Sequence, residues 1–154
     1  MNNFRSIGRN MMIADKYFKL YLRDALQPYG LNAAEGVVLL MLYEQAARRG
    51  KTQDELIREI HYDKGVMTRT MKELEQKDYV VREQNPTDSR SYLFSLSEKA
   101  LDFKNTLTAV LQKWNSALLD GLSTEQLTLV ETALDRMAQN AAAAYSDKSP
   151  DSRN

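Results

Sequence analysis

Residues 63–96 constrain the fold of this chain more than any other stretch. The segment DKGVMTRTMKELEQKDYV has helical periodicity and leads into a short strand, the turn NPTDSR and a second strand, YLFSLS. Met67, Met71 and Leu74 follow spacings of four and three residues, which places them on one apolar helix face. The pattern predicts a helix that packs against a core and is followed by a β-hairpin.

The other side of this predicted helix is short, polar and basic. It carries Lys64, Gly65, Val66, Thr68, Arg69 and Lys72. A helix with one apolar face toward the core and one basic face toward solvent suits insertion into the major groove of DNA. We interpret Arg69 as a candidate for a base contact and the two lysines as candidates for phosphate contacts. A solvated charged face is the alternative interpretation.

The loop from Asn85 to Arg90 is predicted to form a wing beside this helix. Its residue pairs Asn-Pro and Asp-Ser are typical of turns. An arginine at a wing tip can enter the minor groove of DNA, whose negative potential attracts guanidinium groups. We therefore assign Asp88, Ser89 and Arg90 to the DNA-binding surface. The alternative for Arg90 is an arginine that is only solvated on a turn.

A second short helix is predicted directly before the basic helix. Thr52 and Glu55 form a capping box that opens it, and residues 61–63 alone connect it to the basic helix. Two short helices joined so tightly predict a helix-turn-helix. The strands of the hairpin are expected at residues 79–83 and 92–96, which are rich in β-branched and aromatic residues.

Helix-start and helix-stop signals place longer helices on both sides of this region. The start signals are Asn32 with Glu35, Ser97, and Ser123 with Gln126; the stop signals are Pro28 with Gly30, and Gly121. The predicted fold is mainly α with a small β-hairpin wing, a winged helix-turn-helix core flanked by N- and C-terminal dimerisation helices. We expect a single winged-helix domain over residues 1–145, with a DNA-binding lobe at 32–96, dimerisation helices at 4–28 and 97–145, and a disordered polar tail at 146–154.

The outer helices carry apolar stripes at spacings of three and four residues. The stripe of the first helix is Phe4, Ile7, Met11, Ala14, Phe18, Tyr21 and Ala25; that of the sixth is Leu127, Val130, Leu134, Met137 and Ala141. A homodimer that pairs these helices with their copies uses this surface and fits two-fold recognition of DNA. A monomeric helical bundle that buries the same stripes is the alternative.

Composition limits the chemistry open to the chain. With no cysteine and one histidine among 154 residues, the usual nucleophile–base pairs and thiolate metal sites are missing. We therefore expect no enzyme activity, no cofactor and no metal site. The longest apolar run, residues 37–43, is far shorter than the roughly 20 residues that span a bilayer, so a cytoplasmic protein without a membrane partner is expected.

The formal net charge of zero counts against nucleic-acid binding, because DNA-binding domains are usually basic. Between Lys64 and Lys72, however, three positive residues stand without an acidic one. Local placement rather than an overall field would then drive binding to double-stranded DNA. A winged-helix adaptor that binds protein instead of DNA remains the alternative.

Four aromatic residues are candidates for an effector site. Tyr17, Phe18, Tyr21 and Trp114 could line a cleft where the first and fifth helices approach the winged domain. Such a cleft could hold a small aromatic anion. Ordinary packing of these side chains is the alternative interpretation.

These motifs together resemble the MarR family of bacterial winged-helix regulators. The family pattern at the start of the recognition helix corresponds here to Asp63, Lys64, Gly65, Thr68 and Arg69, and its wing pattern, aspartate-x-arginine, to Asp88 and Arg90. The resemblance is strongest over residues 52–100. It implies a homodimeric repressor that binds a pseudo-palindromic operator and is released by a small aromatic or phenolic ligand.

Three positions depart from the family pattern. Asp78 stands where glycine usually ends the recognition helix, Ala100 stands where glycine usually follows the wing, and Gly65 replaces a frequent serine. The first two concern helix geometry more than DNA chemistry. Gly65 lacks the serine hydroxyl that could form a hydrogen bond with a phosphate or a base.

Overall fold

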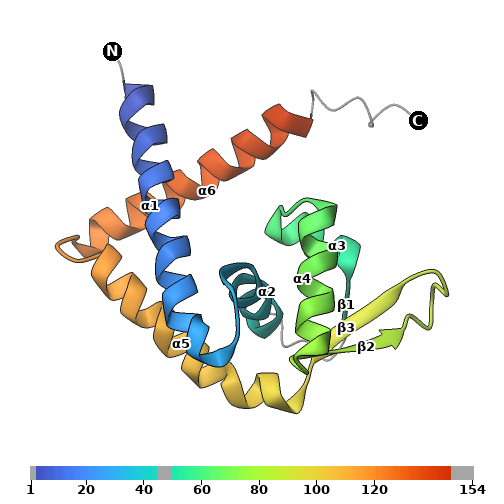
Figure 1. Ribbon diagram of the computed structural model, residues 1–154. Coiled ribbons are helices and arrows are strands. Elements are labelled where there is room, and N and C mark those ends of the chain that lie inside the picture. The colour runs from blue at the N-terminus through green and yellow to red at the C-terminus, as the bar shows by residue number, and fades with distance from the viewer. Residues whose placement is uncertain (1–2, 45–49, 147–154) are drawn as a thin grey trace. The chain divides into compact units, whose positions relative to one another are not determined.

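The computed structural model describes residues 3–44 and 50–146. Its elements run along the chain from the blue to the red end of the ribbon in Figure 1. They are α1 (Asn3–Leu26), the 3-10 helix η1 (Gln27–Tyr29), α2 (Ala33–Glu44), β1 (Lys51–Thr52), α3 (Gln53–Ile60), α4 (Lys64–Gln76), β2 (Val80–Gln84), β3 (Tyr92–Leu96), α5 (Glu98–Leu118) and α6 (Thr124–Ser146). The predicted fold class, mainly helical with a small antiparallel sheet, is confirmed.

The chain divides into two compact units, Met1–Trp114 and Asn115–Asn154. The first unit holds every element from α1 to β3 and most of α5. The second holds the last residues of α5 and all of α6. No helix within residues 3–44 and 50–146 is long and apolar enough to cross a membrane.

The predicted capping pairs set the helix starts. The backbone N–H of Asn32 donates to Glu35 Oε2 at 2.7 Å, and that of Glu35 donates to Asn32 Oδ1 at 2.9 Å. Thr52 and Glu55 make the same reciprocal pair at α3. The pair at α6, Ser123 with Gln126, has distances of 2.9 and 3.2 Å. Each pair satisfies backbone donors that the first turn of a helix leaves free.

The sheet has three strands rather than the two of the predicted hairpin, in the order β1-β3-β2. The added strand, β1, pairs Lys51 with Phe94 in antiparallel register. A Cβ on Gly50 would lie 2.9 Å from the carbonyl oxygen of Phe94, so the absence of a side chain lets the two backbones approach. The first wing strand covers residues 80–84, one residue later than predicted.

The core of the first unit forms around α2, which packs against α1, α4 and β3. Met67, Met71 and Leu74 of α4 are buried in it, as their spacing predicts. From α1 the fully buried side chains are Leu22 and Leu26, one position later than the predicted stripe residues Tyr21 and Ala25. The helix therefore turns a slightly different face to the core than its three-and-four spacing indicates.

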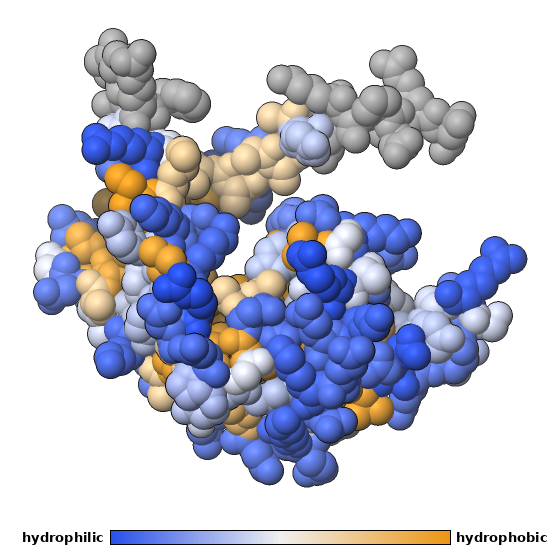
Figure 2. Space-filling view, viewed as in Figure 1, coloured by the Kyte–Doolittle hydropathy of each residue, from blue (hydrophilic) through white to orange (hydrophobic). Residues whose placement is uncertain are grey.

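Large apolar side chains remain exposed on both outer helices. On α1 they are Ile7, Met11, Met12, Ile13 and Tyr17; on α6 they are Leu129, Val130, Leu134 and Tyr145. Orange hydrophobic groups reach the surface over α1, whereas the wing is mainly hydrophilic (Figure 2). The side chain of Phe4 and the predicted tail beyond Ser146 lie outside the described residues.

Candidate nucleic-acid interface

The helix-turn-helix is formed by α3 and α4. His61 ends α3 in the left-handed conformation, with a φ of 57°, and its backbone N–H donates to the carbonyl of Ile57. Asp63 then caps α4, because its Oδ1 accepts the backbone N–H of Val66 at 2.9 Å. A carboxylate at this end also interacts favourably with the positive end of the helix dipole. The three-residue connection thus starts α4 at a fixed position.

The predicted DNA-facing residues of α4 lie together on its outer side. Lys64, Gly65, Thr68, Arg69 and Lys72 are exposed, and Val66 is half-buried. Along the opposite face, the predicted apolar residues and Thr70 are buried. A Cβ on Gly65 would lie 3.2 Å from Asp63 Oδ1, so a larger residue there would press on the cap.

Gln53 is a neighbour of this surface that sequence reasoning missed. Its Nε2 donates to Thr68 Oγ1 at 2.6 Å, and that hydroxyl donates to the carbonyl of Lys64 at 2.8 Å. The contact joins the first residue of α3 to the exposed face of α4. No spacing rule links positions 53 and 68, because their proximity depends on how the two helices cross.

Some cations of the helix-turn-helix and the wing have an acidic partner and others do not. Lys51 forms an ion pair with Glu59, Lys77 with Glu35, and Arg82 with Glu75. Within the part of the chain that the structure describes, no acidic side chain forms an ion pair with Lys64, Arg69, Lys72 or Arg90. A net charge of zero therefore coexists with unpaired positive charge on α4 and at the wing.

The wing loop is held by a dense set of hydrogen bonds. Asn85, which is buried, accepts the backbone N–H of Thr87 at 3.1 Å and donates to Ser91 Oγ at 2.8 Å. Gln84 Nε2 donates to the carbonyl of Ser89 at 2.7 Å. The backbone N–H of Arg90 donates to Asp88 Oδ1 at 3.0 Å. Asp88, Ser89 and Arg90 are themselves exposed at the end of the hairpin.

The C-terminal end of α4 is anchored by a buried carboxylate. Lys77, which caps the helix, has its Nζ 2.6 Å from Glu35 Oε1, and the Glu35 side chain is fully buried. Lys99 Nζ donates to the carbonyl of Lys77 and lies 4.5 Å from the ring centre of Tyr79. Burial, and secondarily the charge of Glu35, raise the pKa of Tyr79. Contacts from α2 and α5 thus meet at the C-terminal end of α4.

The two departures from glycine have different structural settings. Asp78 has a φ of 61°, the left-handed conformation that glycine adopts without strain and aspartate tolerates better than most residues. Ala100 is fully buried, and its carbonyl accepts a hydrogen bond from the hydroxyl of Tyr43. Burial raises the pKa of Tyr43 to about 12, so this phenol keeps the proton that it donates.

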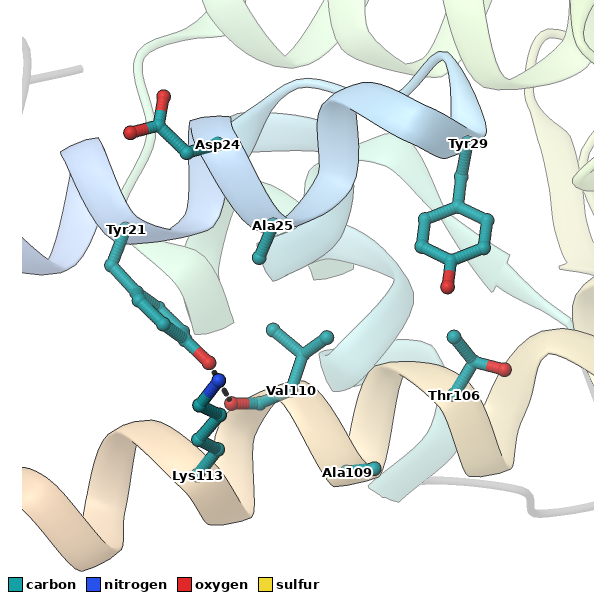
Figure 3. Close-up of a pocket in the computed structure, with 8 residues that line it drawn as sticks. All are labelled: Tyr21, Asp24, Ala25, Tyr29, Thr106, Ala109, Val110 and Lys113. Carbon is teal, nitrogen blue, oxygen red and sulfur yellow. Dashed lines mark hydrogen bonds between the residues drawn. The ribbon is translucent and has the colours of Figure 1, made fainter.

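A cleft of about 620 Å³ lies between α1, η1 and α5. Its lining residues are Tyr21, Asp24, Ala25, Tyr29, Thr106, Ala109, Val110 and Lys113. The rings of Tyr21 and Tyr29 point from the α1–η1 side toward α5, and the hydroxyl of Tyr21 donates to the carbonyl of Val110 at 2.9 Å (Figure 3). The carboxylate of Asp24 points away from α5 (Figure 3). The cleft is thus aromatic and aliphatic, with one ammonium group on its α5 side.

Three of the four predicted effector residues form one aromatic cluster. The ring centre of Trp114 lies 5.6 Å from that of Phe18 and 5.2 Å from that of Tyr21. Tyr17 is 55% exposed, and its ring lies 5.5 Å from Lys16 Nζ. Of the four, Tyr21 lines the cleft. Sequence reasoning missed Tyr29, Thr106 and Lys113, because only the packing of α1 and η1 against α5 brings them together.

Known proteins match both the sequence and the fold. A sequence profile of the MarR family matches residues 29–91. The chain is 32% identical over 129 residues to the HTH-type transcriptional regulator BilQ of Clostridioides difficile (strain CD3), a match that covers 83% of this chain and 85% of the relative.

Solved structures of proteins from other organisms share the fold. A MarR transcriptional regulator from Methanosarcina mazei Go1 matches with a TM-score of 0.82 at 24% identity, covering 91% of this chain and 99% of the other. The MepR–DNA complex of S. aureus matches with a TM-score of 0.78 at 17% identity, covering 86% and 96%. The sequence motifs of α4 and the wing, the three-stranded winged fold and the match along the sequence lead to one conclusion. This chain belongs to the MarR family of winged-helix transcriptional regulators.

Proposed function

We propose that this DNA-binding regulator is a repressor that binds a pseudo-palindromic operator as a homodimer, with α4 in the major groove and the wing in the minor groove. The observation that carries the proposal is the unpaired positive charge of Lys64, Arg69 and Lys72 on the exposed face of α4. Lys51, Lys77 and Arg82, by contrast, form ion pairs with acids of the same chain. Charge left without an internal partner is available for phosphates and base edges.

The residues of α4 take different roles in this proposal. Arg69 reaches a base edge, where a guanidinium can bond guanine through two parallel hydrogen bonds. Lys64 and Lys72 contact phosphates as point charges. Gly65 and Val66 let the helix start approach the groove. Thr68 has its hydroxyl engaged by Gln53 and Lys64, so it contributes its methyl group and its shape.

The wing supplies the second contact. Arg90 is exposed beside Asp88 and Ser89 at the end of the hairpin. A guanidinium inserted into the minor groove gains from the negative potential there and reads groove width rather than a unique base pattern. The hydrogen bonds within residues 84–91 support this role, because a fixed loop loses little conformational freedom when it binds.

Exposed apolar side chains support the homodimer. Met11 and Met12 on α1, and Leu129 and Leu134 on α6, are all at least 46% exposed. Clusters of large apolar side chains at a surface mark interaction sites. A two-fold dimer also presents two copies of α4, which an operator with two half-sites requires.

The cleft between α1, η1 and α5 supports a small aromatic carboxylate as effector. Its aromatic and aliphatic walls suit a ring, and Lys113 can take the carboxylate. Tyr21 belongs to both the cleft and the aromatic cluster with Phe18 and Trp114, so a bound ring would disturb that cluster. The ligand would release DNA by binding more tightly to an arrangement in which the two copies of α4 do not fit the operator.

The test is a titration of the purified chain with DNA from upstream of its own gene and with random DNA of equal length. We expect tighter binding to the upstream DNA at moderate salt and protection of a two-fold sequence. If no sequence competes better than random DNA, the proposal is wrong and the winged-helix adaptor becomes the better description. No observation on the described residues favours that adaptor at present.

A further inference from the structure

The side chain of Arg82 contacts both halves of the candidate interface. Its Nε lies 3.2 Å from Oε1 of Glu75, in the last turn of α4. Its guanidinium carbon lies 4.6 Å from the ring centre of Tyr92, the first residue of β3 after the wing loop. One planar cation on β2 therefore joins the recognition helix to the returning strand of the wing.

We propose that Arg82 is a positioning residue for DNA binding that fixes the wing relative to the recognition helix. Through Glu75 and Tyr92 it sets the separation at which Arg69 and Arg90 enter adjacent grooves. This inference rests on the proposed function, since it assumes that both arginines contact DNA.

The wing needs such a link because little of it is buried. In β2, Val80 is buried and the four following residues, 81–84, are exposed. Strand β1 pairs with β3 at Phe94 and Leu93, so the wing beyond these residues has two strands, and a two-stranded hairpin on its own is at best marginally stable in water. Arg82 pairs with Phe94, which is buried, and lies on the same sheet face as Tyr92. It therefore stands where the buried base of the hairpin gives way to the exposed wing.

The chemistry of arginine suits this position better than that of lysine. A guanidinium can hold a carboxylate through its edge while its flat face lies on an aromatic ring. The Arg82 and Glu75 side chains are 45% and 37% exposed, and exposed ion pairs add little to folding stability. The contribution should therefore appear in DNA binding, where a small change of wing position matters, rather than in the unfolding free energy.

Direct contact of Arg82 with a phosphate is the competing explanation. Arg82, Glu75, Thr68 and Lys72 line one cleft of about 350 Å³, so the guanidinium is near the DNA-facing side chains. The two explanations differ in sign for Glu75. Removal of a negative charge beside DNA should strengthen binding if charge alone matters. Removal of the partner of a positioning residue should weaken it.

The experiment compares Arg82→Lys, Glu75→Gln and their combination by operator titration over a range of salt concentrations. We expect each single variant to weaken operator binding about three- to tenfold, with little further loss in the combination, because the two side chains act as one unit. Arg82→Lys keeps its charge, so the slope of log affinity against log salt should stay that of the parent chain. Thermal unfolding of each variant should match the parent.

Glu83→Gln is the matched control. Glu83 is exposed on the same strand, carries the same charge and forms no ion pair within the described ranges. We expect it to bind operator as tightly as the parent or more tightly. If Glu75→Gln behaves like Glu83→Gln, or if Arg82→Lys keeps full affinity, the positioning role is wrong. The parent chain serves as the reference for the proposed function itself: if it shows no preference for any operator, that proposal fails first.

Discussion

The backbone N–H of Arg90 donates to the carboxylate of Asp88 at 3.0 Å, so the acid and the base of the wing motif are joined through the main chain. Asp88 thereby closes a turn that points the Arg90 side chain outward. Two opposing effects of Asp88 on DNA binding follow, because its charge repels phosphates while its oxygen orders the loop.

We expect ordering to dominate at the wing. Asp88→Ala should weaken operator binding, by less than Arg90→Ala does, and the double variant should lose little more than Arg90→Ala alone. Asp88→Asn keeps an acceptor oxygen and removes the charge, so it should bind at least as tightly as the parent chain. Fluorescence anisotropy at moderate salt measures all four. Tighter binding by Asp88→Ala would mean that the carboxylate does not position the wing.

Substitutions of Arg69 and Lys72 should have different effects on DNA binding, because we assign a base contact to Arg69 and a phosphate contact to Lys72. Arg69→Ala should cost roughly 1–3 kcal/mol per site on operator and less on random DNA, because a base contact carries specificity. Lys72→Ala should weaken both DNAs alike and make the salt dependence shallower. Competition titrations with the two DNAs give the comparison. An Arg69→Ala chain that keeps its full preference for operator would contradict the base contact.

The apolar stripes predict a homodimer in solution. Sedimentation at micromolar concentration should give twice the mass of one chain. Met11→Lys and Leu134→Lys place a charge on exposed apolar positions of α1 and α6 and should shift the mass toward that of a monomer. Gln139→Lys, at an exposed polar position of α6, is the control and should leave the dimer intact. A parent chain that stays monomeric would remove the basis for a two-fold operator.

An aromatic carboxylate should act through the cleft between α1, η1 and α5. Trp114 contacts Tyr21, a lining residue, so salicylate should change tryptophan fluorescence and reduce operator binding over the same concentration range. Ala109→Leu narrows the cleft and Lys113→Ala removes its ammonium group; each should abolish both responses. Thr108→Leu, at an exposed α5 position outside the lining, is the control. A fluorescence change without loss of DNA binding would leave the cleft without a regulatory role.

The Glu35–Lys77 pair should matter for stability as well as for position. Lys77→Met leaves a fully buried carboxylate without its cation, which should lower the unfolding free energy by about 3 kcal/mol. Lys19→Met breaks an exposed pair with Asp15 and should cost less than about 1 kcal/mol. Urea unfolding measures both. Adding Glu35→Gln to Lys77→Met should recover part of the loss, since the buried charge is then gone. Equal losses for the two lysine variants would show that burial of Glu35 carries no penalty.

Local signals in the sequence predicted much of this fold. The reciprocal caps of α2, α3 and α6 act within four residues, so they can be identified without tertiary structure. The spacing of Met67, Met71 and Leu74 likewise fixed the buried face of α4. The wing motif placed Asp88 and Arg90 in one turn, where their hydrogen bond forms.

Features that depend on tertiary packing could not be predicted in this way. Strand β1 has two residues, and Gly50 directly before it leaves room for the chain to lie against β3. Leu22 and Leu26 became the core residues of α1 because α2 approaches that side of the helix. The contacts of Gln53 with Thr68 and of Arg82 with Glu75 join elements whose relative position no periodicity encodes.

The internal pairing of cations also bears on how such a regulator finds its site in a chromosome. Competing random sites outnumber an operator by about a millionfold or more, and they hold a protein through phosphates alone. Lys51, Lys77 and Arg82 already have acidic partners in their own chain, so they should add little to non-specific binding of DNA. We therefore expect such a protein to leave random DNA quickly, so that a modest number of copies would keep its operator occupied.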